Sequence, residues 1–430
     1  MTQRTRVLIL VIALVSFLGG FAQVFAGGGR EVTPQRERFT MYWNSNHRYD
    51  IYQQVIDDFA EEHNLDIDIQ TYLWPDMRTK LLTDFSGGTV PDLIQVPAPW
   101  IAEFAASGLM LDLSDRISQW PDSTDWFEST WVEVSVDNRR FGIKNHHTTF
   151  GMFYNKEIFR QAGLDPESPP RTLSEFRNVL ETIANTVGPD VLGFAFDQDA
   201  GYLVNFFASE NTPFLIENGR IAINTPEIAE SLQVLQDIAA NGWTLIAEPG
   251  ASYQTARRAF FEGSVAMMLS GPWDLATLAN DVPDLDFGIA PPPSLGGIEP
   301  RTMVAGTAIG IPADARHADL AWELTTRLTD LDVLIAATLE AGMLMPRRSW
   351  AEDPRVQAES GVADFAQIIP FARPFDIEAA SLGISDLTWS GGGGDLTTVL
   401  YQNIIYNRQP AAAALADYVR EGNRLLQQRQ

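Results

Sequence analysis

The sequence predicts an α/β protein with more than one domain, and three observations support this fold class. Short apolar runs alternate with stretches whose apolar residues recur at helical spacing, which is typical of strands joined by helices. The chain has 430 residues, and at roughly 100–200 residues per domain this length favours two or three domains. Hydrophobic residues make up 45% and charged residues 20% of the chain, so the composition supports large cores.

The first elements can be assigned in order from periodicity. Strands are predicted from short apolar runs at residues 39–43, 67–72 and 93–96. Between the first two runs, apolar side chains recur at a spacing near 3.6, at Ile51, Val55 and Phe59, which predicts a helix. Residues 27–38 are rich in glycine and charge and have no apolar period, so we expect a flexible segment there and a fold that starts near Phe39.

Two later helices have clear start signals. Residues 173–183 follow Thr172, which can form a capping box with Glu175. Residues 227–240 follow Asn224-Thr225-Pro226, an N-cap residue followed by a proline at the first helical position. Both segments therefore continue the alternation of strands and helices.

The first 26 residues are typical of a cleaved secretory signal. Arg4 and Arg6 precede an apolar run from Val7 to Leu18. The segment ends at Val24-Phe25-Ala26, with small residues three before and immediately before the expected cut. The alternative is a membrane anchor, but spanning a bilayer takes about 20 apolar residues and this run is shorter. No cysteine follows the leader to carry a lipid, so we expect a free protein in a bacterial periplasm.

The charge balance and the absence of cysteine exclude several functions. The chain has 30 basic and 56 acidic residues, a net charge of −26, whereas nucleic-acid binding depends on basic groups that neutralise phosphates. No nucleic-acid partner is therefore expected. The chain has no cysteine, which excludes disulfides, thiolate metal sites and a cysteine nucleophile.

No motif in the chain indicates an enzyme or a cofactor. The five histidines do not form a His-Glu-x-x-His zinc helix, and His146-His147 on an extended segment would point to opposite faces. The glycines at 391–394 are not followed by the residues of a phosphate-binding loop. Ser270 lacks the flanking glycines of a nucleophile elbow and is interpreted as structural. We expect neither a metal nor another cofactor.

Four segments carry motifs that match a known family. The most specific joins Phe153-Tyr154-Asn155-Lys156 to Pro169-Pro170 and to the helix start at 172–176. The others are residues 91–94 with 100–112, residues 260–273, and residues 306–312 with 318–324. In their order along the chain, these segments resemble the extracellular solute-binding proteins of sugar-importing ABC transporters, the family of maltose-binding protein. Residues 209–213 depart from the Gly-Gly turn that the family often has after the position of Asn205.

The resemblance implies a fold like that of type II periplasmic binding proteins. Two interleaved α/β lobes would close on a ligand in the cleft between them. The expected lobes are residues 39–145 with 306–344, and residues 146–305 with 345–430. The hinge strands would lie near residues 143–149, 303–306 and 342–345. The implied role is to deliver a sugar, chemically unchanged, to the permease subunits of an ABC importer, and we expect a monomer.

A sugar receptor needs flat aromatic rings and fixed hydrogen-bonding groups, and several residues are candidates. Trp273 matches the position of the family's ligand-stacking tryptophan. Trp43, Asn44 and Asn46 follow the first strand, although Asn44 could instead cap the next helix. Gln95 and Trp100 follow the third strand, although Trp100 could instead be a hydrophobic staple.

The remaining candidates lie in the crossing segments and in the second lobe. His146, His147 and Thr148 fall in the first crossing, where a solvated hinge is the alternative interpretation. Gly306-Thr307 should let the backbone approach a ligand closely, because glycine lacks a side chain. Tyr202, Asn205 and Trp389 rest on weaker matches to segments that face the family's cleft.

Two rival functions remain open at the level of the sequence. One is a secreted glycoside hydrolase that uses paired carboxylates in an aromatic cleft. The other keeps the fold but changes the cargo to a polyamine, a glycerol phosphate or a metal. The acidic balance argues against an anionic cargo, although Arg347 and Arg348 could still hold one.

Overall fold

Two five-stranded sheets organise the computed structural model, which describes residues 36–196, 215–246, 254–295, 302–374, 379–380, 382, 387 and 395–429. The first sheet has the strand order β2-β1-β3-β16-β6. Its strands are β1 (Glu37–Asn44), β2 (Leu65–Tyr72), β3 (Leu93–Pro97), β6 (Gly142–Lys144) and β16 (Thr307–Gly310). Strand β1 pairs in parallel with β2 and β3, whereas β16 runs antiparallel to β3 and β6. The first strand begins two residues before the expected Phe39.

The second sheet has the order β12-β9-β13-β8-β14. Its strands are β8 (Gly151–Asn155), β9 (Leu192–Phe196), β12 (Thr244–Ile246), β13 (Val265–Ser270) and β14 (Phe287–Ala290). Strands β12, β9 and β13 are parallel, and β8 is antiparallel to both of its neighbours. Two short hairpins pair β4 (Ser135–Val136) with β5 (Arg139–Arg140) and β10 (Ile216–Glu217) with β11 (Arg220–Ile221).

A small three-stranded sheet takes two of its strands, β7 and β15, from the two chain segments that connect the larger sheets. It has the order β17-β15-β7, from β7 (Thr148–Thr149), β15 (Thr302–Ala305) and β17 (Ala372–Arg373). The expected hinge segments near 143–149 and 303–306 therefore contain strands. Residues 342–345 do not form a strand. Within them, the backbone carbonyl of Leu344 accepts one hydrogen bond from the backbone N–H of His147 at 2.9 Å.

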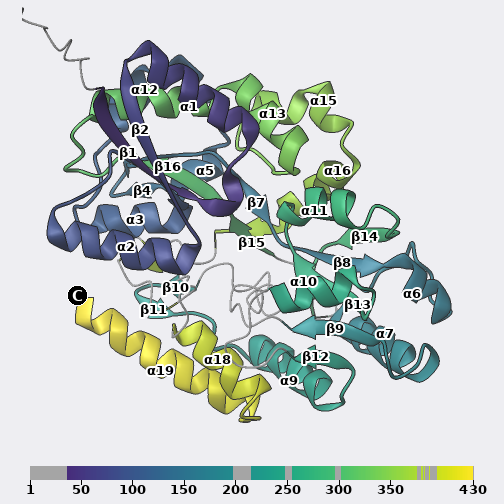
Figure 1. Ribbon diagram of the computed structural model, residues 1–430. Helices are drawn as coiled ribbons and strands as arrows, with labels where there is room; N and C mark the ends of the chain where they lie inside the picture. Colours follow the sequence, from purple (N-terminus) through teal and green to yellow (C-terminus); the bar gives the residue numbers. More distant parts are fainter. Residues whose placement is uncertain are drawn as a thin grey trace, which may run out of the picture. The chain divides into compact units, whose positions relative to one another are not determined.

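Helices cover both sheets, and several of them start at a capping side chain. Thr172 and Glu175 form the expected capping box at the start of α7 (Leu173–Thr186). Thr225 caps α9 (Pro226–Ala240), and its hydroxyl accepts from the N–H of Ile228. Helix α9 packs with α18 (Leu396–Ile405) and α19 (Ala411–Arg429), as Figure 1 shows. Helix α1 (Asp50–Glu62) packs on α12 (Ala318–Leu328) and α13 (Leu331–Ala341).

The other helices complete the two cores. They are α2 (Trp74–Gly87), α3 (Ala98–Ala106), α4 (Ser114–Gln119), α5 (Glu128–Val132), α6 (Lys156–Gln161), α10 (Gln254–Phe261), α11 (Trp273–Asp281), α14 (Arg348–Glu352), α15 (Pro354–Gln357) and α16 (Ser360–Ile368). Among the described residues, short 3₁₀ helices form at Ser45–His47, Pro121–Asp125 and Ile369–Phe371. None of the helices within the described residues has the length and apolar content that a membrane span requires. The expected lobe boundaries stay a prediction, because contacts group residues 37–430 as one unit.

Candidate functional site

Polar side chains gather where strands of the first sheet end. Strands β1 and β3 are parallel and end at Asn44 and Pro97. Because β16 is antiparallel to β3, its first residue, Thr307, pairs with Pro97 at the same edge. Strand β6 also ends there at Lys144, and Asn145 and His146 follow it. Loops at the carboxyl edge of an α/β sheet are common ligand sites, so this edge is the candidate site.

Five residues at this edge of the sheet form a hydrogen-bonded group, which we call the polar cluster: Asn44, Gln95, Asn145, His146 and Thr307. Gln95 lies at its centre, where its Oε1 accepts from the backbone N–H of Asn44 at 3.3 Å and its Nε2 donates to Thr307 Oγ1 at 3.4 Å. Thr307 Oγ1 donates to Asn145 Oδ1 at 2.9 Å and lies 2.9 Å from His146 Nδ1. All five side chains are at least 96% buried. The cluster thus links β1, β3, β16 and the first crossing segment.

Aromatic rings surround His146. The His47 ring lies 4.6 Å from it, centroid to centroid, at an interplanar angle of 88°. The rings of Tyr49, the N-cap residue of α1, and of Tyr52 within α1 lie 5.9 Å and 6.4 Å away. His47 also joins the hydrogen bonds of the polar cluster, since its Nδ1 lies 3.2 Å from Gln95 Oε1. The site therefore combines neutral polar groups with ring faces.

Three buried atoms of the polar cluster have no hydrogen-bond partner among the described residues: Asn44 Nδ2, Asn145 Nδ2 and His146 Nε2. The nearby Tyr52 hydroxyl also lacks a partner of standard hydrogen-bond geometry among the described residues. A hydrogen-bonding interaction with the Asn145 side chain nevertheless opposes the rise that burial causes in the pKa of Tyr52. Buried polar groups are nearly always bonded to protein or water. Several unpaired groups in one place therefore point to a site that receives a polar ligand.

Burial keeps the imidazoles of this region neutral at pH 7. It lowers the pKa of His47 to about 4, against the opposing effect of the bond to Gln95. It also holds the pKa of His146 well below its ordinary value, and the charges of His47 and Lys144 add to this effect. The polar cluster therefore consists of uncharged hydrogen-bonding groups near neutral pH.

Acidification is expected to destabilise the protein through these imidazoles. In the unfolded chain they take up protons near pH 6.5, whereas folded His47 does so at about pH 4. The unfolded state binds more protons between these two pH values. The free energy of unfolding should therefore fall as pH decreases across that window, by up to about 1.4 kcal/mol per pH unit for each imidazole. Urea unfolding at pH 7.5, 6.5 and 5.5 measures this slope. His47→Gln should reduce the slope, and identical slopes in both proteins would contradict the prediction.

Gly306 lies beside the polar cluster in a conformation that other residues rarely adopt. Its φ is +134°, and a Cβ atom added there would lie 2.2 Å from the carbonyl oxygen of His146. A glycine was expected here so that the backbone could approach a ligand. The structure supplies a different reason, because the close neighbour is the backbone of the first crossing segment.

Trp43 and Trp100 are core residues in this structure. Trp43 is 2% exposed, its indole N–H donates to the carbonyl of His47 at 2.8 Å, and its ring lies edge-on to Tyr52. Trp100 is also 2% exposed, lies within α3 and packs beneath the Arg78 guanidinium at 5.0 Å. A bound ligand would have to displace these partners to reach either ring face. Both remain candidates for ligand contact only as untested predictions.

The other candidates near the polar cluster differ in their surroundings. Asn44 Oδ1 accepts from the backbone N–H of Asn46, which is the capping interaction that was the alternative interpretation, and Asn46 itself is exposed. His147 lies apart from His146, with its Nδ1 3.3 Å from Lys144 Nζ and its ring 6.1 Å from Phe127. Thr148 is buried in β7 opposite Ala305. The expectation that the two histidines face opposite directions agrees with these contacts.

Trp273 lies on the second sheet's side of the chain. It is the first residue of α11, is partly exposed, and lies edge-on to Phe150 at 5.4 Å. Its ring covers Gly271 so closely that a Cβ atom there would lie 2.2 Å from it. This packing holds the ring in one orientation, as a stacking platform requires. Three further candidates, Tyr202, Asn205 and Trp389, lie outside the described residues.

Sequence reasoning missed four residues that the structure brings to the site: His47, Tyr49, Tyr52 and Asn145. Asn145 lies in the crossing segment that was proposed, between Lys144 and His146. Tyr49 is the N-cap residue of α1 and Tyr52 lies three residues later in its first turn, and their rings stack with centroids 5.2 Å apart. Two tyrosines three residues apart, just after the loop that follows the first strand, are the sequence pattern that indicates this pair of rings.

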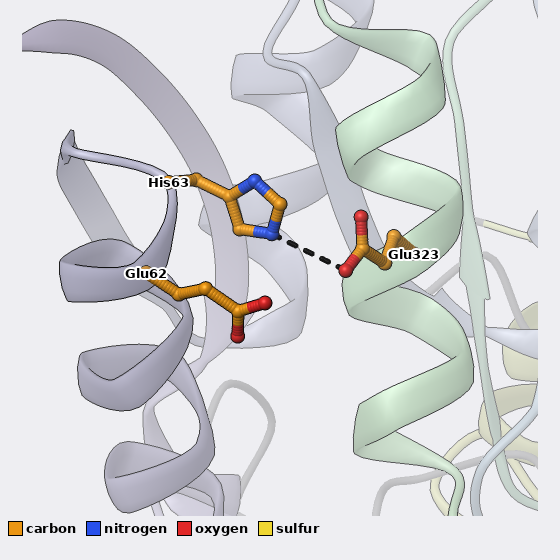
Figure 2. Close-up of side chains that lie close together, drawn as sticks. All are labelled: Glu62, His63 and Glu323. Carbon is orange, nitrogen blue, oxygen red and sulfur yellow. Dashed lines mark hydrogen bonds and ion pairs between the residues drawn. The ribbon is translucent and has the colours of Figure 1, made fainter.

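A possible metal-ligating group lies away from the polar cluster, at the contact of α1 with α12. Figure 2 shows His63 pointing toward Glu323, with Nε2 and Oε1 3.2 Å apart, and Glu62 beside them. Both carboxylates pair with Arg327, which reaches Glu62 at 2.6 Å and also bonds Glu323. A cation would have to compete with this guanidinium, so we interpret the group as a contact between two helices.

Comparison with known proteins supports the fold and identifies the family. The model of bacterial extracellular solute-binding proteins matches residues 43–330. A maltotriose-binding protein of Pyrococcus abyssi is 25% identical over 330 residues, covering 74% of this chain and 69% of the relative. An arabinooligosaccharide-binding protein of Bacillus subtilis is 24% identical over 294 residues, covering 66% of this chain and 67% of the relative.

A solved structure agrees with the expected fold class. An ABC transporter solute-binding protein of Thermotoga lettingae, solved with bound α-D-tagatose, aligns with a TM-score of 0.78 at 20% identity. The alignment covers 91% of this chain and 100% of the other. The prediction of an α/β fold of the type II periplasmic-binding class is thereby confirmed. The family model matches well over half of this chain, and the chain therefore belongs to the bacterial extracellular solute-binding proteins.

Proposed function

We propose that this protein is the receptor of an ABC importer that captures a sugar or oligosaccharide between two lobes and delivers it to a membrane permease. The observation that carries the proposal is the buried polar cluster with its three unpaired hydrogen-bonding atoms. A sugar presents many uncharged hydroxyls, and neutral amides and imidazoles can pair with them without a charged partner. The two oligosaccharide-binding relatives support the same cargo class.

The proposal includes that the ligand leaves unchanged and that the protein is not an enzyme. Family members are binding proteins. The polar cluster consists of amides, a hydroxyl and an imidazole, whereas glycoside hydrolysis needs two carboxyl groups that flank the scissile bond. Incubation of the purified protein with oligosaccharides tests this point, since sustained release of smaller sugars would establish the hydrolase instead.

An anionic cargo held by Arg347 and Arg348 finds little support in the contacts of these residues. Arg347 is 5% exposed and already bonds Asp125 at 2.7 Å and Asp122 at 3.3 Å. Arg348 donates to the carbonyl of Thr124 at 2.6 Å. Both arginines therefore hold the 3₁₀ helix at Pro121–Asp125 against the start of α14. A phosphate would have to displace carboxylates from Arg347.

Export, location and partners are part of the proposal. The leader at residues 1–26 would direct the chain to the periplasm and be removed. The mature protein would act there as a monomer, without a lipid anchor, and its lobes would meet the permease after they close on the ligand. Closure requires a ligand that binds the closed form better than the open form.

A thermal-shift screen tests the cargo class. Purified mature protein is heated with D-glucose, maltose, maltotriose, arabinotriose, spermidine or glycerol 3-phosphate. A ligand at 100 times its Kd stabilises the folded state by about 2.7 kcal/mol, so one or more of the sugars should raise the melting temperature clearly. A shift with spermidine or glycerol 3-phosphate alone would replace the sugar with that cargo.

Trp273→Ala should weaken binding of the sugar found in that screen by about 1–3 kcal/mol through lost burial and stacking. Titration calorimetry measures the change. The matched control is Trp322→Ala on α12, a partly exposed tryptophan that packs on Trp120 and should leave affinity unchanged. Unchanged affinity in Trp273→Ala, with the fold intact by circular dichroism, would remove Trp273 from the site.

A further inference from the structure

The direction of hydrogen bonding in the polar cluster is determined by groups that can only donate. The backbone N–H of Asn46 bonds Asn44 Oδ1 at 2.9 Å, and the backbone N–H of Asn44 bonds Gln95 Oε1 at 3.3 Å. A backbone N–H cannot accept, so both side-chain oxygens are acceptors. Asn44 Nδ2 is therefore the free end of its amide, and Gln95 Nε2 donates to Thr307 Oγ1 at 3.4 Å.

The same reasoning assigns the proton on each imidazole. His47 Nδ1 faces Gln95 Oε1 at 3.2 Å and must carry the proton. Thr307 has one hydroxyl proton, which it donates to Asn145 Oδ1 at 2.9 Å. His146 Nδ1, 2.9 Å from the same Thr307 oxygen, must then be the donor. A neutral imidazole that is protonated at Nδ1 exposes a lone pair at Nε2, and this is the His146 atom without a partner.

The unpaired atoms therefore have opposite hydrogen-bonding roles. His146 Nε2 is an acceptor, whereas Asn44 Nδ2 and Asn145 Nδ2 are donors. The three side chains are 0–1% exposed, so an unmatched group here costs about 1–3 kcal/mol. A group that both donates and accepts, such as a ligand hydroxyl, satisfies atoms of both kinds.

We propose that His146, Asn44 and Asn145 form a subsite for ligand hydroxyls, in which His146 Nε2 accepts a ligand O–H and the two amides donate to ligand oxygens. This assignment rests on the proposed function and narrows its cargo to ligands that present hydroxyl groups. An ionised phosphate offers no proton to His146 Nε2, and an ammonium group offers no lone pair to the amides. The direction of these bonds excludes an ammonium group and an ionised phosphate group from the subsite. A polyamine is therefore rejected, and a glycerol phosphate can enter only through its hydroxyls.

Histidine ring NMR tests the proton assignment before any ligand is added. The protein is labelled with ¹⁵N-histidine at pH 7, and the resonances are assigned with His47→Gln and His146→Gln. The subsite requires that His146 Nε2 resonates as an unprotonated nitrogen and that Nδ1 carries the proton. The reverse tautomer would mean that Asn145 points its amide nitrogen at Thr307, and it would overturn the proposal.

The second arm adds the sugar that gave the largest shift among D-glucose, maltose, maltotriose and arabinotriose. The His146 Nε2 resonance should move in the direction of an accepted hydrogen bond. Asn145→Asp keeps the acceptor for Thr307 but removes the amide donor, so its affinity for that sugar should fall at least tenfold. The control, Asn155→Asp, keeps the oxygen that caps α6 by accepting from the N–H of Ile158 at 3.0 Å and should bind like the wild type.

The outcomes separate this inference from the proposed function. A sugar that binds without moving the His146 Nε2 resonance, and equally well to Asn145→Asp, would mean that only buried water pairs with these atoms. That result overturns the subsite and leaves the receptor function standing. If no sugar raises the melting temperature, the receptor function for these sugars fails first, whatever the tautomer.

Discussion

Replacing Lys144 with methionine is expected to lower the free energy of unfolding by about 3–5 kcal/mol. Lys144 is 0% exposed and its Nζ lies 2.6 Å from Glu133 Oε1, while Glu133 is 3% exposed. Burial already raises the pKa of Glu133 against the opposing charge of Lys144. Without the ammonium group, the carboxylate must either stay charged in the interior or take up a proton, and both cost free energy.

Two further variants give this experiment its controls. Lys156→Met removes a lysine whose partner, Glu167, is 70% exposed, and should cost less than about 1 kcal/mol. The double variant Glu133→Leu with Lys144→Met removes both buried charges and should be more stable than Lys144→Met alone. Urea unfolding at pH 7.5 measures all of these variants. If Lys144→Met loses no more unfolding free energy than Lys156→Met, the buried ion pair of Lys144 with Glu133 does not stabilise this segment.

The pair also bears on the site, because Lys144 directly precedes Asn145 and His146. Its Nζ lies 3.3 Å from His147 Nδ1, and its backbone carbonyl accepts from the indole N–H of Trp126 at 3.1 Å. These contacts anchor the start of the first crossing segment on the side away from the polar cluster. Loss of the pair should therefore weaken ligand binding as well as stability.

Substitution of Gly306 by alanine is the second large expected effect, at about 3 kcal/mol or more. Two penalties combine there. The φ of +134° is unfavourable for any residue with a Cβ atom, and that atom would lie 2.2 Å from the carbonyl oxygen and 2.8 Å from the carbonyl carbon of His146. Both neighbours are backbone atoms, so no side-chain rotation can relieve the contact, and either β15 and β16 or the first crossing segment must shift.

Gly163→Ala separates the two penalties. Gly163 also has a positive φ, +72°, but no atom lies within 4 Å of the position that its Cβ would take. It should therefore show the conformational cost alone, about 1–2 kcal/mol. Unfolding in urea compares the two variants, and Gly306→Ala should also weaken sugar binding because Thr307 follows it. Equal stability losses in both variants would mean that the backbone contact with His146 relaxes freely.

Much of the local structure was predictable because its signals involve residues close in sequence. The capping box of Thr172 with Glu175, the N-cap at Thr225 and the helical spacing of Ile51, Val55 and Phe59 each involve residues within about one or two turns. Such interactions depend on neighbours that the sequence itself supplies. The extended segment 342–345 is an exception, since it is held by Thr338 and His147 rather than by a strand partner.

The sequence by itself determined the alternation of strands and helices, the helix starts and the family, because periodicity, capping and motif spacing are local or ordered along the chain. Tertiary structure alone decided which polar groups meet. Gln95 and Thr307 lie 212 residues apart, and the register of β3 with β16 brings their side chains within hydrogen-bonding distance. The tertiary structure also places Trp43 and Trp100 in the core rather than on an open surface. Both outcomes depend on contacts between distant segments, which no local pattern in the sequence records.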